Sequence, residues 1–220
     1  MSKPTRLFDY LKSNIDTAGR ILKLAKREKG GWKTYGKEEI IQIVDSISKG
    51  LLAKGIKKGD KVALMSGNRP EWNFIDFACN QLGVALVPLY PTLSAQDLSY
   101  IVKDAEAKML FVSNQDLVLK VEKAVAENKL ELDIYTLDEV PNYQHYSALI
   151  EAGSQQDTDL KPYNDAVQPK DLLTLIYTSG TTGLAKGVML CENNLINLVN
   201  SGLRLAVLRD VGLSILPYHH

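Results

Sequence analysis

The stretch that decides the fold is residues 61–90, KVALMSGNRPEWNFIDFACNQLGVALVPLY. Two of its segments, 61–66 and 85–90, are short, apolar and rich in Val and Leu, which is typical of buried strands. Between them, residues 70–81 have apolar side chains at helical spacing, with a proline in the first turn. A strand, a helix and a second strand in succession indicate a βαβ unit with parallel strands.

The same alternation continues toward the C-terminus. Ser94 and Asp97 form a capping box for a helix that we expect to run to about Ala107. A strand over 109–112, a helix over 115–127 and a strand over 133–137 follow. The predicted fold class is therefore α/β, with a mostly parallel sheet flanked by helices on both faces.

The N-terminal residues have helical rather than alternating periodicity. Residues 6–27 predict one amphipathic helix or two, ended by Gly30 and Gly31, and residues 37–54 predict another, with Gly55 at its C-terminal end. Residues 153–170 are polar, contain two prolines and have no period, so they predict a surface linker. We expect a first subdomain over 1–152 and the start of a second over 171–220.

Composition limits the partners that the chain can attract. Lys and Arg total 26, as do Asp and Glu, so the formal net charge is zero and no global field favours nucleic acid.

Cys79 and Cys191 have no metal or redox spacing, which fits a reducing cytoplasm, and we predict no metal site in this chain. No secretory signal opens the sequence, and polar residues and prolines interrupt the apolar run 77–96, so no transmembrane segment is expected.

The segment that indicates chemistry is residues 172–190, LLTLIYTSGTTGLAKGVML. An apolar strand leads into a loop of hydroxyl residues, glycines and one lysine, Lys186. Glycines allow several backbone N–H groups to converge, hydroxyls add neutral donors, and the lysine adds a positive charge, so the loop predicts a polyphosphate site. A plain Gly/Thr turn is the simpler alternative. A Walker-type loop is excluded, because Ala185 precedes the lysine, Gly187 follows it and the next residues are strand-like.

From Tyr177 to Val188 the segment resembles the phosphate-binding signature of the adenylate-forming superfamily, which includes acyl-CoA synthetases, luciferases and peptide-synthetase adenylation domains. Ala185 stands where the family usually has proline, and Glu192 where histidine is common. The phrases 68–72 (NRPEW) and 83–94 (GVALVPLYPTLS) resemble the long-chain fatty acid–CoA ligase branch. The resemblance implies that this chain is the N-terminal part of an acyl-CoA synthetase-like fold.

The resemblance also implies roles for the loop. In this family the loop closes over the ATP phosphates while a carboxylate attacks the α-phosphorus; a thiol, that of CoA, then displaces AMP. Lys186 would stabilise the departing pyrophosphate, and Gly180 and Gly183 would permit the bend. ATP, Mg²⁺, CoA and a fatty acid are the implied cofactors and substrates. The hydroxyl and backbone donors would be Thr178, Ser179, Thr181 and Thr182.

The end of the sequence resembles the Leu-Pro-Leu-x-His phrase of the family, which would place His220 near the acyl and pantetheine path. Tyr218 departs from that phrase, and a purification tag could also end in His-His. No Tyr-Gly-x-Thr-Glu phrase follows the loop, so we expect these residues alone to be inactive. Two alternatives are another adenylating enzyme, such as a fatty acyl-AMP ligase or aryl-CoA ligase, and a short non-catalytic binding or assembly protein. Self-association through uncovered apolar surface is predicted, and peripheral membrane contact stays open.

Overall fold

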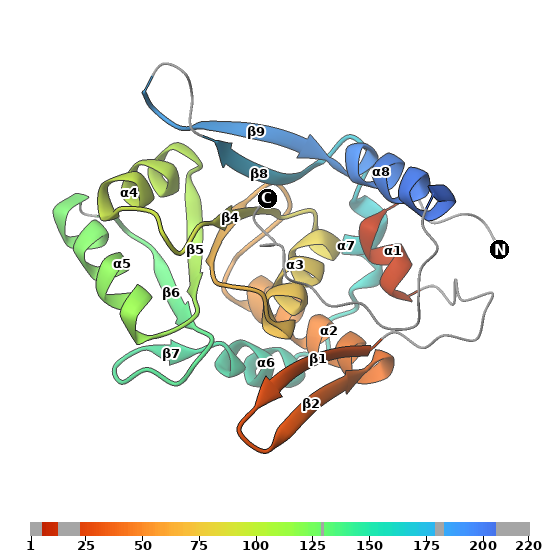
Figure 1. Cartoon of the computed structure of the whole chain (residues 1–220). Helices are drawn as coiled ribbons and strands as arrows, with labels where there is room; N and C mark the ends of the chain where they lie inside the picture. Colours follow the sequence, from red (N-terminus) through yellow and green to blue (C-terminus); the bar gives the residue numbers. More distant parts are fainter. Residues whose placement is uncertain (1–5, 13–22, 129, 179–182, 206–220) are drawn as a thin grey trace.

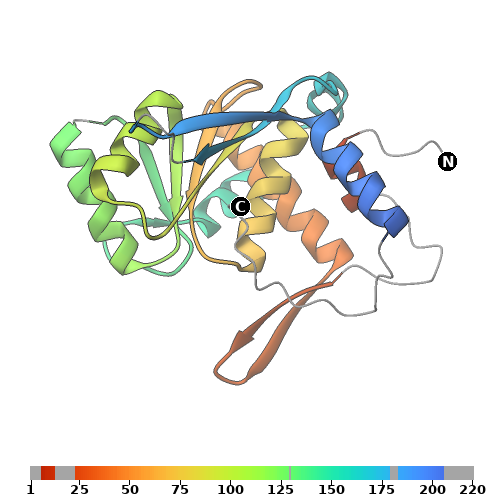
Figure 2. The same ribbon diagram turned by 45° about the horizontal axis from the view of Figure 1, so that its top comes forward.

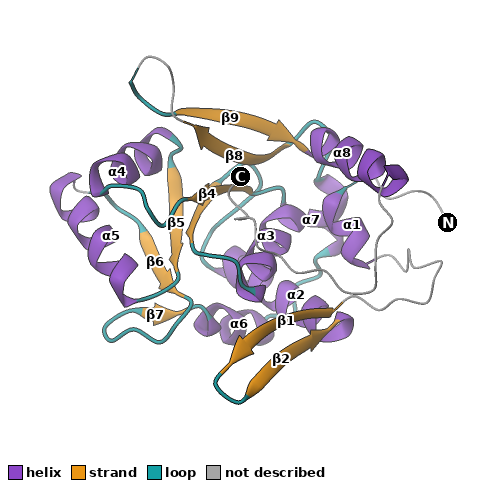
Figure 3. Ribbon diagram, viewed as in Figure 1, coloured by secondary structure: helices purple, strands orange, loops and turns teal. Residues whose placement is uncertain are grey.

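The computed structural model describes residues 6–12, 23–128, 130–178 and 183–205 (Figure 1). Strands and helices alternate along most of this part of the chain, as Figure 3 shows. The helices are α1 (Leu7–Lys12), α2 (Lys37–Ala53), α3 (Pro70–Leu82), α4 (Ala95–Asp104), α5 (Gln115–Asn128), α6 (Ser147–Ser154), α7 (Lys161–Ala166) and α8 (Glu192–Leu205). The strands are β1 (Lys23–Glu28), β2 (Gly31–Gly36), β3 (Lys61–Met65), β4 (Ala85–Leu89), β5 (Ala107–Val112), β6 (Asp133–Thr136), β7 (Gln144–His145), β8 (Leu172–Thr178) and β9 (Lys186–Cys191).

The described residues form a seven-stranded sheet in the order β7-β6-β5-β3-β4-β8-β9. All neighbouring strands in it are parallel except β8 and β9, which are antiparallel. The chain moves from β3 to β4 on one side and then crosses to β5 on the other. The predicted fold class, a mostly parallel sheet flanked by helices, is therefore confirmed.

Two hydrophobic clusters cover the two faces of the sheet. One joins α2, α3 and α6 to alternate residues of β3, β4 and β5, such as Val62 and Leu64. The other joins α4 and α5 to the intervening residues, such as Ala63 and Met65, and to Leu175 and Tyr177 of β8. Because successive side chains of a strand point to opposite faces, the fully apolar strands predicted from sequence supply both clusters.

Several predicted element ends are visible in the backbone. Ser94 caps α4, since its hydroxyl oxygen accepts a 3.0 Å hydrogen bond from the N–H of Asp97. Gly55 follows α2 with a φ of +80°, which suits glycine just past a helix end. The apolar run 77–96 contains the end of α3, all of β4 and a turn, and in the described residues no helix is both long and apolar enough to cross a bilayer.

The predicted helix over 6–27 is wrong for its last residues. Helix α1 ends at Lys12, and Lys23–Glu28 is strand β1, paired antiparallel with β2; residues 13–22 lie outside the described part. Gly30 lies in a hairpin turn and Gly31 begins β2, so neither ends a helix; Gly31 has a φ of +137°. Leu24 packs against the hydrophobic cluster formed with α2, α3 and α6, and Tyr35 lies within that cluster. The ring of Tyr35 is 5.1 Å from that of Phe74 and nearly perpendicular to it. These tertiary contacts favour the strand over a helix.

The segment 153–170, predicted as a linker, contains the end of one helix and a second short helix. Its first residues end α6, and α7 follows, with Leu160 and Val167 buried on either side of α7. Strand β8 joins the sheet through the pair Leu86–Thr174, and the Thr174 hydroxyl donates a 2.9 Å hydrogen bond to the Leu86 carbonyl. The division into subdomains over 1–152 and 171–220 stays a prediction.

Candidate functional site

The two stems of the predicted phosphate loop are β8 and β9. They form an antiparallel pair in which Thr178, the last residue of β8, is the partner of Lys186, the first residue of β9. Both side chains are exposed. The stems therefore bring the hydroxyl and the lysine at the two ends of the motif side by side, at the carboxyl end of a strand that runs parallel to β4.

Tyr177 anchors the first stem. Its ring is buried, and its hydroxyl donates a 2.6 Å hydrogen bond to Oδ2 of Asp104 at the end of α4. Burial is the main reason that the pKa of the Tyr177 hydroxyl is raised, and the bond to Asp104 adds to it. The loop therefore starts from a fixed point on the body of the protein.

Gly187 is the cross-strand partner of Tyr177, and the tyrosine ring covers it. A Cβ atom at Gly187 would lie 3.1 Å from Cζ of that ring, which is tighter than ordinary contact. Ala185, in the position that is usually proline, is partly buried against the same cluster as Tyr177. The small residues around Lys186 thus let β9 lie close to β8.

The structure describes only part of the predicted site. Thr178, Gly183 and Lys186 are within it, and Gly183 has a φ of +106°, a conformation that favours glycine. Ser179, Gly180, Thr181, Thr182 and His220 lie outside the described residues.

Several large apolar side chains are exposed between Gly183 and Leu198, on the second loop stem and the helix that follows it. Leu184, Val188 and Met189 are 64%, 45% and 69% exposed, and Leu198 on α8 is 71% exposed. Apolar surface of this kind fits contact with further protein. Self-association of this chain stays a prediction.

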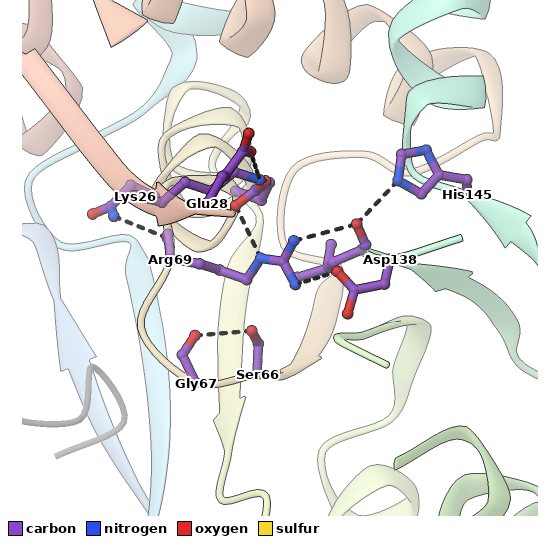
Figure 4. Close-up of polar contacts among 10 residues, drawn as sticks. Lys26, Glu28, Ser66, Gly67, Arg69, Asp138 and His145 are labelled. Carbon is purple, nitrogen blue, oxygen red and sulfur yellow. Dashed lines mark hydrogen bonds and ion pairs between the residues drawn. The ribbon is translucent and has the colours of Figure 1, made fainter. Parts of the chain in front are cut away.

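A second polar group lies at the carboxyl ends of β3 and β6 (Figure 4). Arg69, just before α3, donates 2.9 Å hydrogen bonds to Asp138 and to Glu71 and a longer one to the Leu137 carbonyl. Lys26 of β1 reaches the other oxygen of Glu71 at 2.5 Å. These contacts join the β1–β2 hairpin, helix α3 and the end of β6.

Glu71 is the charge at the centre of that group. It is only 2% exposed, and burial opposes its ionisation, but the hydrogen bonds from Arg69 and Lys26 outweigh burial and lower the pKa of its carboxyl to about 2. Sequence reasoning missed Lys26, since that residue was assigned to a helix. The Gly30–Gly31 pair is typical of a hairpin turn, but it does not by itself specify the strand that precedes it.

Glu192 opens α8 beside the stems, and its carboxylate is buried. Burial raises the pKa of this carboxyl, although a hydrogen bond from the N–H of Leu7 partly opposes the rise. The departure from the family's histidine therefore has a structural consequence here, because Glu192 holds α1 against α8.

Comparison with known proteins shows the family to which the chain belongs. The family described as AMP-binding enzyme matches residues 19–220, and the chain belongs to that family. Among curated relatives, it is 29% identical to fatty acyl-CoA synthetase A of Dictyostelium discoideum over 99% of this chain and 35% of that protein. It is 34% identical to the peroxisomal long chain acyl-CoA synthetase 7 of Arabidopsis thaliana over 86% of this chain and 28% of that protein.

Solved structures show the same fold. A crystal structure of the anthranilate CoA ligase AuaEII with anthranoyl-AMP has a TM-score of 0.73, with 22% identity over 90% of this chain and 37% of that one. The chain spans about a third of the length of the curated relatives named above.

Proposed function

We propose that the complete polypeptide containing this chain is an ATP-dependent, AMP-forming long-chain fatty acid–CoA ligase. It would convert a fatty acid carboxylate to an acyl-adenylate and pyrophosphate, and then transfer the acyl group to the thiol of CoA. The observation that carries the proposal is the stem register, in which Thr178 and Lys186 are cross-strand partners in a chain similar to long-chain acyl-CoA synthetases.

The chain's own part in the reaction would be to hold the ATP phosphates. The Thr178 hydroxyl and the loop donors 179–183 would bind phosphoryl oxygens, and the Lys186 ammonium would offset the negative charge that develops on the leaving pyrophosphate. Strand β8, fixed by Tyr177, would keep these groups in place through the reaction. His220 is proposed to lie on the acyl and pantetheine path.

Magnesium is implied by the family resemblance. In the described residues, no three His, Cys, Asp or Glu side chains come together in a way that could hold a metal ion. The residues that complete the reaction are expected in the rest of the polypeptide, and residues 1–220 alone are expected to be inactive.

The test is acid-dependent ATP–pyrophosphate exchange by the complete polypeptide, with no acid, acetate, a medium-chain acid, a long-chain acid and benzoate. Exchange driven best by the long-chain acid supports the proposal. Exchange driven by benzoate would replace it with an aryl-CoA ligase, and long-chain exchange without CoA ester formation would replace it with a fatty acyl-AMP ligase. A folded protein without any exchange would favour a non-catalytic role.

A further inference from the structure

The β1–β2 hairpin carries an exposed tryptophan close to its turn. Trp32 is 60% exposed and is the second residue of β2, directly opposite Arg27 of β1. In Figure 2 the hairpin extends away from the sheet and its helices, with the turn at its far end. An indole of this size in water is unusual unless it contacts something else, since Trp has a large apolar surface to bury.

The two faces of the hairpin differ in what they contact. Leu24 and Tyr35 point inward, toward the hydrophobic cluster formed with α2, α3 and α6, and Lys26 points toward Glu71. Cross-strand partners share a face and alternate residues share a side, so the opposite face is formed by another set. We call this set the outer face; it consists of Lys23, Ala25, Arg27, Trp32 and Thr34, and all five are exposed.

The hairpin is strongly basic in a chain whose net charge is zero. Residues 23–36 contain five basic side chains and one acidic side chain, Glu28. Glu28 pairs with Lys26, which also pairs with the buried Glu71. Among the ion pairs formed within the described residues, none involves Lys23, Arg27 or Lys29, and all three side chains are exposed.

We propose that the outer face of the hairpin is a contact site for an anionic lipid bilayer. Trp prefers the boundary between headgroups and acyl chains, where its ring is apolar and its N–H is polar, and basic residues beside it are attracted to anionic lipids. Nucleic acid fits less well, because the basic surface is confined to one short hairpin and the remainder of the chain has a net negative charge. The hairpin is tied to the body through Lys26 and Glu71, so the bilayer would be held in a fixed orientation to the sheet.

The test is binding of the complete polypeptide to vesicles of phosphatidylcholine alone and of phosphatidylcholine with phosphatidylserine. We expect binding to the anionic vesicles only, weakened by salt, with a blue shift of tryptophan emission that is absent in Trp32→Phe. The double variant Lys23→Gln/Arg27→Gln should bind roughly 30-fold more weakly, from about 1 kcal/mol per charge.

Matched controls lie on the far side of the molecule. Lys103→Gln/Lys123→Gln removes two exposed charges from α4 and α5, and Tyr163→Ala removes an aromatic that is 40% exposed on α7. Neither should change vesicle binding. Equal binding to both vesicle types, equal loss in the control variants, or binding to a DNA duplex but not to anionic vesicles would overturn the proposal. None of these outcomes bears on pyrophosphate exchange, which needs no membrane.

Discussion

The carboxylate of Glu192, the first residue of α8, accepts a 2.9 Å hydrogen bond from the backbone N–H of Leu7, the first residue of α1. The first N–H groups of a helix have no partner inside it, so an acceptor from elsewhere stabilises the helix. This contact joins residues 185 positions apart and docks the N-terminal helix beside the stems of the candidate site.

The Glu192 contact predicts effects of different size for two substitutions. Glu192→Ala should lower the free energy of unfolding by about 1 kcal/mol, because it removes the acceptor, whereas Glu192→Gln keeps an acceptor oxygen and should cost much less. The raised pKa means that the wild-type carboxyl contributes stability below its ordinary pKa and loses it as pH rises through the folded-state pKa. In urea denaturation, the free energy of unfolding of Glu192→Gln relative to that of wild type should therefore be higher at pH 8 than at pH 5. Equal stability of wild type and Glu192→Ala would contradict the role of this contact.

Glu71 predicts a loss of stability in acid. Its pKa is lowered to about 2 from an ordinary value of 4.5, so its contribution is present above pH 4.5 and is lost as pH falls toward 2. The shift corresponds to about 3 kcal/mol. Glu71→Gln should be less stable than wild type by up to that amount at pH 7, and the difference should shrink in acid, as urea denaturation from pH 7 to pH 3 would show.

The control for Glu71 is the same chemical change in a surface ion pair. Glu106 is 81% exposed and lies 3.3 Å from Lys61, so Glu106→Gln should change stability by less than about 0.5 kcal/mol at either pH. A Glu71→Gln variant that behaves like Glu106→Gln would show that the buried group does not stabilise the hairpin.

Two glycines allow α2 and α6 to pack backbone to backbone. A Cβ atom on Gly153 would lie 1.8 Å from the carbonyl oxygen of Ser46, and one on Gly50 would lie 2.3 Å from that of Leu149. Gly153→Ala should therefore force the helices apart and destabilise the fold by about 3 kcal/mol or more. Gly67→Ala, with open space around the new methyl group, should stay within about 0.5 kcal/mol of wild type. Thermal melts of the two variants compare them directly, and similar melting temperatures would refute the close packing.

Tyr177 and Gly187 should act as a unit in the loop stems. Tyr177→Phe removes the bond to Asp104 and should cost about 1 kcal/mol, and Gly187→Ala should displace the ring and cost about as much. Displacement of the ring already weakens the hydrogen bond to Asp104. The free energy of unfolding of the double variant should therefore fall by less than the sum of the two single losses. Denaturation of all four proteins measures this coupling, and strict additivity would mean that Gly187 does not act through the tyrosine.

The elements that could be predicted from sequence are those with a long, unambiguous period. Residues 61–90 gave β3, α3 and β4 within one residue of their ends, since buried parallel strands are apolar throughout and a proline begins the helix. The helix predicted for residues 23–28 was wrong because Leu24 and Ala25 fit a helical as well as an alternating pattern. Only the contact of Leu24 with the hydrophobic cluster of the domain decides between the two. The six-residue α7 and the two-residue β7 are too short to have a period.

The candidate site, too, could be predicted from sequence only where local sequence specifies it. The motif itself predicted strands on both sides of the loop, and the register of Thr178 with Lys186 agrees. The hydrogen bond from Tyr177 to Asp104 and that from Leu7 to Glu192 join residues 73 and 185 positions apart. Neither could be predicted from local sequence, because nothing in a single strand or helix specifies a partner so distant.

The lysine at the start of β9 provides the sharpest test of the candidate site. Lys186 is exposed and contributes no core packing, so Lys186→Ala should leave the melting temperature of the complete polypeptide nearly unchanged. If its charge stabilises the leaving pyrophosphate, the rate of acid-dependent ATP–pyrophosphate exchange should fall by on the order of a hundredfold. Lys170→Ala is the matched control, since Lys170 is an exposed lysine just before the opposite end of β8. Equal exchange by the two variants would remove Lys186 from the mechanism, whereas a loss confined to Lys186→Ala would assign the phosphates of ATP to this loop.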